Sequence, residues 1–180
     1  MYEPEEFHRL LAIYNEYPIR ELIIHPRTRQ EFYKEKIHPE IFKYAYEHSK
    51  NPITFNGEIR SLQAVTALEK EYPAMKNIMI GRGLIAKPGF IMQAADGSLT
   101  ENRTRSKKRL KEFLDCLLEE YRKVMSADIH ALFKMKEIWI YMAPYFTNYE
   151  KYLKKIKKTD KLMEYRASVS SLMTNEDIIE

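Results

Sequence analysis

The chain has 180 residues, of which 44% are hydrophobic and 31% are charged, so it carries enough apolar material for a folded core. No apolar run reaches the roughly 20 residues that a membrane-spanning helix needs, and the N-terminus lacks the basic and apolar segments of a signal peptide. A single cysteine excludes a disulfide framework and a cysteine-built zinc site, and we expect a reducing, cytoplasmic setting.

Three short apolar runs alternate with helical patterns in the first half of the chain. We expect helices that begin near Pro4, Pro39 and Ser61, and strands within residues 21–25, 53–57 and 77–83. The strand centres lie about 25 to 30 residues apart with one helix in each interval, which is typical of a βαβαβ arrangement with parallel strands. Their continuous apolar character predicts strands that are buried on both faces.

The pattern becomes wholly helical after residues 94–98, which we interpret as a linker. A helix is expected from about Ser106, and Cys116 within it is predicted to pack in the core. Its apolar stripe comprises Leu110, Phe113, Leu114, Leu117, Leu118, Tyr121, Val124 and Met125. Three further helices are expected, with caps at Asp128 and at Thr147 or Asn148, and a last start near Asp160. Four antiparallel helices with short loops predict a small four-helix bundle, so the fold class is α/β followed by α.

Each predicted strand turns polar at its carboxyl end, where parallel α/β folds bind their ligands. His25 offers an imidazole, Asn56-Gly57 offers an amide beside a flexible backbone, and Gly81-Arg82-Gly83 offers backbone N–H groups with a guanidinium. Each motif alone is more often an ordinary turn, but the three together favour a phosphorylated, planar cofactor. The histidines show no metal-ligand spacing, so no metal site is predicted.

The charge is concentrated in the second half of the chain. Residues 1–101 are nearly neutral, whereas residues 102–166 carry 17 Lys and Arg against 9 Asp and Glu. Two basic clusters stand out: Arg103, Arg105, Lys107, Lys108, Arg109 and Lys111, and then Lys154, Lys155, Lys157, Lys158 and Lys161. Either cluster could follow a nucleic-acid backbone, or it could be an ordinary solvated helical surface.

Three segments of the chain together resemble the tRNA-dihydrouridine synthases. They are Leu22–Arg29, Phe55–Ile59 and Met79–Gly83, whose order and spacing agree with that family, and Ala131–Glu137 is similar to its helical domain. The resemblance implies the last three β/α units of an FMN-binding (β/α)8 TIM barrel over residues 1–95. It also implies a helical, tRNA-binding domain over residues 101–180.

The resemblance also implies a chemistry and a set of site residues. The family uses NADPH and FMN to reduce uridine in tRNA, and a cysteine acid supplies the second proton to a base that has left its stack. The implied cofactor-binding residues are His25, Asn56, Gly57, Glu58, Gly81 and Arg82, and Glu58 stands where the family more often has Asp or Gly. The residues predicted to bind RNA are Arg27, Arg29, Arg103, Arg105, Lys107, Lys108 and Arg109.

The family's catalytic cysteine and a flavin-contacting lysine have no counterpart in these residues, and Cys116 falls in the helical part. We therefore expect the C-terminal portion of a synthase that is inactive alone and binds FMN weakly. An opened barrel leaves strand edges and apolar faces uncovered, which predicts self-association or recruitment of the missing barrel half. Two alternatives stay open: a non-catalytic RNA-binding module, and part of another oxidoreductase with a barrel that binds FMN or phosphate.

Overall fold

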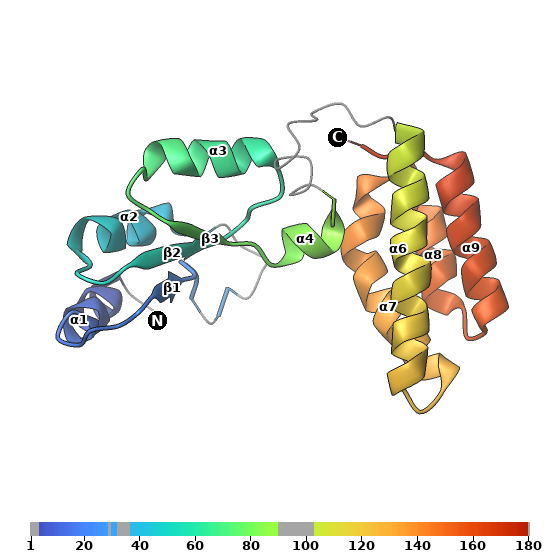
Figure 1. Ribbon diagram of the computed structural model, residues 1–180, viewed down its shortest axis with the longest axis horizontal. Helices are drawn as coiled ribbons and strands as arrows, with labels where there is room; N and C mark the ends of the chain where they lie inside the picture. The colour runs from blue at the N-terminus through green and yellow to red at the C-terminus, as the bar shows by residue number, and fades with distance from the viewer. Residues whose placement is uncertain (1–3, 29, 32–36, 90–102, 180) are drawn as a thin grey trace. The chain divides into compact units, whose positions relative to one another are not determined.

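The protein is described by a computed structural model that covers residues 4–28, 30–31, 37–89 and 103–179 (Figure 1). The chain divides into two compact units, Met1–Gly81 and Arg82–Glu180. The linker predicted at residues 94–98 lies outside the described residues. The domain limits predicted at 1–95 and 101–180 stay a prediction, while the division into compact units falls after Gly81.

A three-stranded parallel sheet forms the centre of the first unit. The strands are β1 (Leu22–Ile24), β2 (Ile53–Asn56) and β3 (Asn77–Met79), in the spatial order β1-β2-β3. The helices are α1 (Pro4–Tyr14), α2 (Pro39–His48) and α3 (Leu62–Glu71). Ile24 pairs with Phe55, and Phe55 pairs with Ile78 in the next strand. The predicted alternation of parallel strands and helices is confirmed.

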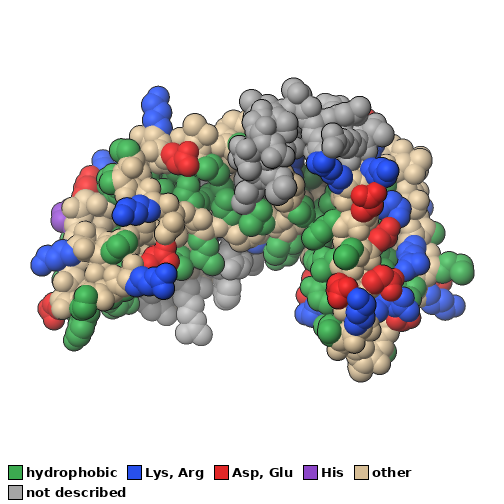
Figure 2. Space-filling view, in the orientation of Figure 1, with side chains coloured by type: hydrophobic (Ala, Val, Ile, Leu, Met, Phe, Trp, Pro, Cys, Tyr) green, Lys and Arg blue, Asp and Glu red, His purple; other side chains and the backbone are tan. Residues whose placement is uncertain are grey.

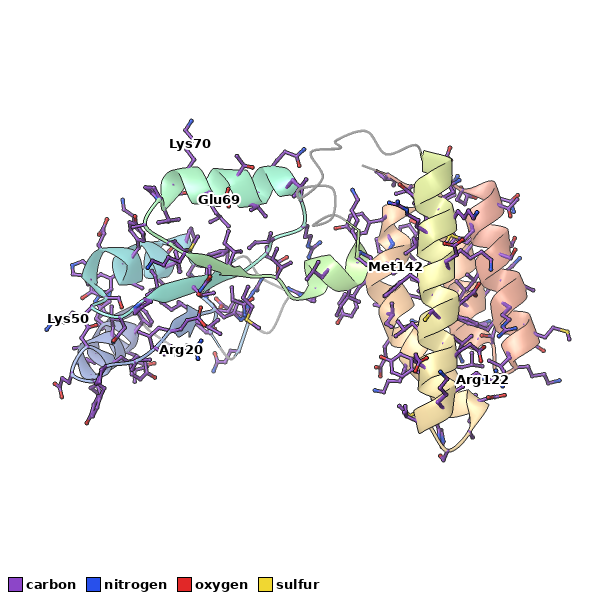
Figure 3. All side chains as sticks on the ribbon, in the orientation of Figure 1. Arg20, Lys50, Glu69, Lys70, Arg122 and Met142 are labelled. Atoms are coloured by element: carbon purple, nitrogen blue, oxygen red, sulfur yellow. The ribbon has the colours of Figure 1, made fainter. Side chains whose placement is uncertain are left out.

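Local sequence signals explain where two of these helices begin. Pro39 opens α2, where the missing proline N–H removes no helical hydrogen bond. The side chain of Ser61 caps α3, because its hydroxyl oxygen accepts a hydrogen bond of 3.2 Å from the amide of Ala64. Lys70 projects from α3 away from the sheet (Figure 3), as expected for a helix whose outer side faces solvent.

One face of the sheet packs against the helices. Phe42 of α2 is fully buried and contacts the ring of Phe55 edge-on, with the centroids 4.8 Å apart. The Phe42 ring also contacts Tyr72 at the end of α3 edge-on, with the centroids 5.1 Å apart. Edge-to-face aromatic contacts add to the stabilisation from burial, so this cluster fixes α2 and α3 on the sheet.

The other face of the sheet is exposed at its two edge strands, so the prediction of burial on both faces is wrong for β1 and β3; it holds for the central strand β2, where both Thr54 and Phe55 are buried. Side chains alternate along a strand, so Ile23 and Met79 point away from the Phe55 cluster. Ile23 is 52% exposed and Met79 is 44% exposed. Leu10 and Tyr14 of α1 are also exposed beside β1, and with Ile23 they line an apolar cleft within this unit. Association through this surface stays a prediction.

The second unit is helical. It contains α4 (Arg82–Ala86), α6 (Arg103–Val124), α7 (Asp128–Met142), η1 (Ala143–Tyr145), α8 (Tyr149–Lys158) and α9 (Leu162–Asn175). The four long helices share one hydrophobic core, and α4 and η1 also pack against α7. Because these two short helices belong to the assembly as well, the predicted four-helix bundle is not confirmed and stays a prediction.

Trp139 lies at the centre of the helical core. Its side chain is fully buried, and its indole N–H donates a hydrogen bond of 2.9 Å to the hydroxyl of Tyr165 on α9. Burial raises the pKa of Tyr165 to about 12, so this hydroxyl stays protonated. Met142 closes the same core near the end of α7 (Figure 3).

The chain after α9 is tied to the α7–α8 connection. Glu176 is buried and accepts hydrogen bonds of 2.9 Å from both Thr147 and Asn148, and Lys151 lies 3.2 Å away. The hydrogen bond from Asn148, with those from its neighbours, lowers the pKa of Glu176 to about 2. Asn148 precedes α8 with a φ of 43°, and its side chain makes no cap.

Several predictions for the helical part were wrong in detail. Cys116 is exposed, and so are Phe113 and Val124, at 44% and 75%. The buried positions of α6 are Leu114 and Leu118, and residues one or two positions away project from other faces of the helix. Asp128 does not cap α7, since Ala127 holds the cap position. The last helix begins at Leu162, slightly later than predicted.

Gly57 has a structural requirement that leads to a first prediction. A Cβ atom at this position would lie 2.5 Å from Cζ of Phe55, whose ring is held in the aromatic cluster. Gly57→Ala should therefore lower the free energy of unfolding by about 1–2 kcal/mol through overpacking. Gly81→Ala is the control, because a Cβ there meets nothing within 4 Å. Chemical denaturation followed by circular dichroism measures both; equal stability of the two variants contradicts the prediction.

Candidate functional site

The carboxyl ends of the three strands bring together residues that the sequence analysis singled out. His25 follows β1 directly, Asn56 is the last residue of β2, and Gly81 follows β3 by two positions. Asn56 pairs in register with Met79, and Ile24 with Phe55, so the three residues lie at the same edge of the sheet. His25 and Gly81 are exposed and Asn56 is half-buried, so this edge presents polar groups to solvent.

Glu58 joins two arginines just beyond this edge. Its Oε1 accepts a hydrogen bond of 2.8 Å from Arg27, and its Oε2 accepts one of 2.7 Å from Arg60. The side chain of Arg27 is only 3% exposed, whereas that of Arg60 is 60% exposed. The carboxylate therefore ties the segment after β1 to the segment after β2 and holds a second guanidinium at the surface. Sequence analysis missed Arg60, whose only signal was its place two residues after Glu58.

This arrangement changes how two predicted roles are interpreted. Arg27 was predicted to bind RNA, but its guanidinium is buried in the ion pair with Glu58. Glu58 was predicted to bind the cofactor, but its carboxylate is engaged by Arg27 and Arg60, and a carboxylate repels phosphate unless guanidiniums lie between them. Both residues are placed to position the strand-end segments. Arg29, also predicted to bind RNA, lies outside the described residues.

A second polar cluster lies in the segment that leads from β1 to α2. Glu31 accepts a hydrogen bond from the Thr28 amide at 2.6 Å, and its other oxygen lies 2.5 Å from Nε2 of His38. Glu40 lies 3.1 Å from Nδ1 of the same ring. The hydrogen bond from His38, followed by that from the Thr28 backbone, lowers the pKa of Glu31 to about 2, and the bond to Glu31 raises the pKa of His38.

The Glu31–His38 pair gives a second prediction. The contribution of Glu31 to stability is present above its ordinary pKa of 4.5 and is lost as the pH falls toward 2. The contribution of His38 is present below its ordinary pKa of 6.5 and is lost as the pH rises through its raised value. Both contributions to stability are therefore fully present between about pH 4.5 and 6.5, and NMR titration should give His38 a pKa above 6.5.

Two variants distinguish how much Glu31 and Glu40 each raise the pKa of His38. Glu31→Gln should return the pKa of His38 most of the way to 6.5, because the bond to Glu31 is the main cause of the shift. Glu40→Gln, the matched control, should lower it less. A larger effect of Glu40→Gln would contradict the assignment.

Two further predicted cofactor residues differ in their surroundings. Gly57 packs under the Phe55 ring, so its small size serves the core, whereas Gly81 has open space where a Cβ would stand. Arg82 is the first residue of α4 and belongs to the second unit. α4 is a short helix of five residues.

The three lysines of the basic cluster on α6 each form an ion pair with an acidic side chain. The Nζ of Lys107 lies 2.9 Å from Asp177, that of Lys108 lies 3.9 Å from Glu112, and that of Lys111 lies 2.6 Å from Asp115. Acidic and basic side chains alternate over the face of this helix (Figure 2). The side chains of Arg103 and Arg105 lie outside the described part of the chain.

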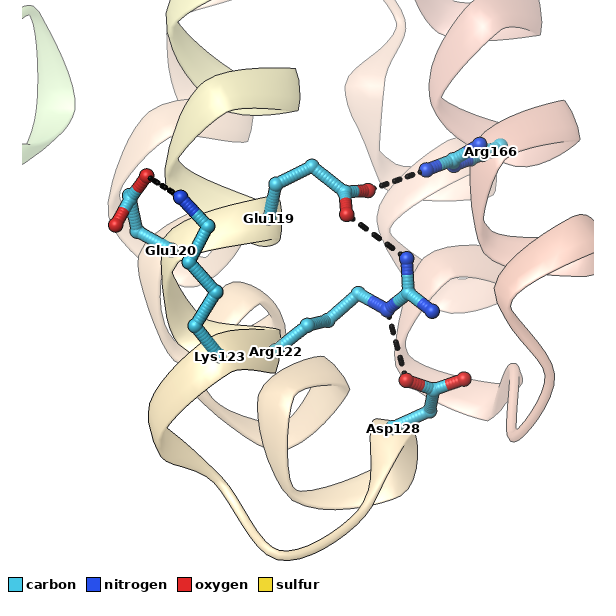
Figure 4. Close-up of polar contacts among 6 residues, drawn as sticks. All are labelled: Glu119, Glu120, Arg122, Lys123, Asp128 and Arg166. Carbon is cyan, nitrogen blue, oxygen red and sulfur yellow. Dashed lines mark hydrogen bonds and ion pairs between the residues drawn. The ribbon is translucent and has the colours of Figure 1, made fainter.

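The pairing continues at the far end of α6. Glu119 accepts hydrogen bonds of 2.8 Å from Arg122 and 2.6 Å from Arg166 of α9, and Arg122 also donates to Asp128 of α7 (Figure 4). The same figure shows Lys123 bonded to Glu120. These cations join three helices, and α6 therefore presents much less free positive charge than its composition indicates.

Comparison with known proteins places this geometry in a family. The family model for dihydrouridine synthases matches residues 6–179. The chain belongs to the dihydrouridine synthase family. The family match therefore covers both the sheet whose carboxyl edge carries His25 and the helical unit that follows.

Individual relatives agree with the family assignment. The chain is 32% identical over 108 residues to a probable tRNA-dihydrouridine synthase of Rickettsia bellii (strain RML369-C), a match that covers 59% of this chain and 32% of the relative. It is 35% identical over 75 residues to a tRNA-dihydrouridine(16) synthase of Pseudomonas syringae pv. tomato, covering 42% and 23%. The chain thus spans about a third of the length of the curated relatives it matches. No described helix of this family member is long and apolar enough to cross a membrane.

Proposed function

We propose that this chain is the C-terminal portion of a flavin-dependent tRNA-dihydrouridine synthase, which reduces uridine to dihydrouridine in tRNA with FMN and NADPH. One observation carries the proposal: His25, Asn56 and Gly81 meet at the carboxyl edge of a parallel sheet in a chain of the dihydrouridine synthase family. In parallel α/β folds this edge forms the ligand site. A cytoplasmic location agrees with the proposed modification of tRNA.

The residues at this edge fit a flavin mononucleotide. FMN, when bound, supplies the hydride that adds to the uracil ring. The His25 imidazole is suited to hydrogen-bond the planar ring system, and the amide of Asn56 can both donate and accept. The open space beside Gly81 lets backbone N–H groups approach a phosphate, to which Arg82 would add a charge. Gly57 and Glu58 support the site: the glycine accommodates the Phe55 ring, and the carboxylate holds Arg60 at the surface.

The helical unit would hold tRNA in this proposal. Its predicted contacts are Arg103, Arg105, Lys107, Lys108 and Arg109. The cysteine acid of the family has no counterpart among these 180 residues, because the exposed Cys116 lies on α6 of the helical unit. We therefore expect these residues to be inactive alone and to reduce uridine only when the other half of the barrel is supplied.

Retained flavin tests the cofactor part of the proposal. The purified chain is mixed with FMN, passed through gel filtration and examined by visible absorbance. We expect weak but measurable retention that His25→Ala and Asn56→Ala reduce and that Lys70→Ala, on the outer side of α3, leaves unchanged. If no flavin is retained, by the chain alone or together with the missing barrel half, the flavin assignment fails.

A non-catalytic RNA-binding module is the second candidate. It is favoured by the core of the helical unit, whose described members all belong to that unit. It predicts salt-sensitive tRNA binding with no flavin in any form of the protein. Dihydrouridine formation on adding the missing barrel half and NADPH excludes this candidate.

A further inference from the structure

Helix α8 is divided into a buried apolar side and an exposed basic side. Ile156 is fully buried in the helical core and Tyr152 is 6% exposed. The side chains of Lys154, Lys155, Lys157 and Lys158 are all exposed, and we call these four residues the α8 lysine face. At 1.5 Å of rise per residue, they place four positive charges within about 6 Å along the helix axis.

The α8 lysine face differs from the α6 cluster in having no acidic partners. Among the residues that the structure describes, no carboxylate lies within 4.0 Å of these four ammonium groups. Glu150 is the only acidic residue of α8, and the neighbouring Lys151 is the lysine that reaches Glu176. On α6, by contrast, Lys107, Lys108 and Lys111 each have a carboxylate partner.

We infer that the α8 lysine face, rather than the α6 cluster, is the main surface of the helical unit that binds the phosphate backbone of RNA. This inference rests on the proposed function, in which the helical unit holds tRNA, and it replaces the α6 contacts predicted from the sequence, Lys107 and Lys108 among them, with contacts on α8. A lysine already paired with a carboxylate gains less from a phosphate, because the existing pair must first be broken. Unpaired surface lysines release counterions from RNA without that cost.

A helix-dipole role and a membrane-binding role both fit the α8 lysine face less well. Cations in the last turn of a helix interact favourably with the helix dipole, but Lys154 lies at the middle of α8, before the last turn. A membrane surface would require an apolar side free to enter the lipid, and here that side is buried in the protein core. A polyanion with regularly spaced phosphates fits the exposed charge best.

Two matched triple variants test the inference on the full chain. One is Lys154→Gln/Lys155→Gln/Lys158→Gln on α8, and the other is Lys107→Gln/Lys108→Gln/Lys111→Gln on α6. Each removes three positive charges, so the net charge is the same. The readouts are the Kd for tRNA at several salt concentrations and the circular dichroism spectrum, which checks that both variants fold.

We expect the α8 variant to bind tRNA at least about 10-fold more weakly at low salt. Its slope of log K against log salt should fall by about 2, given a slope of about 0.7–0.9 per neutralised phosphate. The α6 variant should keep most of the affinity and of the slope. Equal losses in both variants, or a loss confined to α6, would overturn the inference.

The remaining outcomes test the inference against a lipid partner and distinguish its failure from failure of the proposed function. Tighter binding of the α8 lysine face to vesicles of anionic lipid than to tRNA would also overturn the inference. The flavin retention experiment does not involve these lysines, so its result decides the cofactor part of the proposed function independently. Tight tRNA binding that the α8 variant does not weaken leaves the proposed function standing while the inference fails.

Discussion

Trp139→Ala is expected to lower the free energy of unfolding of the helical unit by about 3–5 kcal/mol, the usual cost of truncating a fully buried large aromatic side chain. The side chain extends from α7 toward Tyr165 of α9 and lies beside Phe146, whose ring centroid is 6.2 Å away. Leu132 and Met135 of the same helix are also fully buried in this core, so the substitution opens a cavity inside it. Denaturation followed by circular dichroism at helical wavelengths measures the loss.

Two milder variants separate the volume of Trp139 from its hydrogen bond. Trp139→Phe keeps much of the apolar volume but leaves the buried Tyr165 hydroxyl without its indole donor, so it should cost less than the alanine variant. In the double variant Trp139→Phe/Tyr165→Phe the cost of the second substitution should be small, because the unpaired hydroxyl is also removed. A Trp139→Ala protein with wild-type stability would contradict the central place of this residue.

The order and type of the elements in the first unit follow from the sequence. Apolar runs of three or four residues with helical segments between them predict parallel strands, because such a connection is long enough for a crossover helix. Pro39 and Ser61 also predict the starts of α2 and α3. These signals are local, so they can be recognised without knowing what the elements pack against.

Burial was predicted less well, because it depends on partners that a local pattern does not contain. The strands are mostly apolar, yet Ile23 is half exposed because the helices of this unit pack on the opposite face. On α6, a run of apolar residues at neighbouring positions allows more than one stripe, and the core uses the one through Leu114 and Leu118. Cys116 projects from another side of the helix and is exposed.

In the candidate site, too, features set by local sequence were predicted and features set by distant side chains were not. Strand ends that turn polar predicted the edge at which His25, Asn56 and Gly81 meet. Pairing between distant side chains was not predictable: Arg27 and Glu58 are 31 residues apart, and Lys107 and Asp177 are 70 apart. Such pairs decide which charges are free, and because they could not be predicted, the helical residues predicted to bind RNA were all placed on α6 and none on α8.

Glu58→Ala is expected to lower the free energy of unfolding of the first unit by about 3 kcal/mol, because it removes the carboxylate from a guanidinium that is 3% exposed. Glu58→Gln keeps a hydrogen-bond acceptor and should cost less, and Arg27→Lys should also destabilise, since an ammonium lacks the planar fork of a guanidinium.

Glu47→Ala serves as the matched control for Glu58→Ala. Glu47 lies 4.0 Å from Lys43 in an exposed pair on α2, so its removal should change stability by only a few tenths of a kcal/mol. Hydrogen exchange of the amides in β1 and β2 reports on this unit, whereas the fluorescence of Trp139 reports on the helical one. If the amides of β1 and β2 exchange at the same rate in Glu58→Ala and in Glu47→Ala, the Arg27–Glu58 pair does not hold the two strand-end segments together. If Glu58→Ala alone exchanges faster and also loses flavin, the pair supports the site that these segments form.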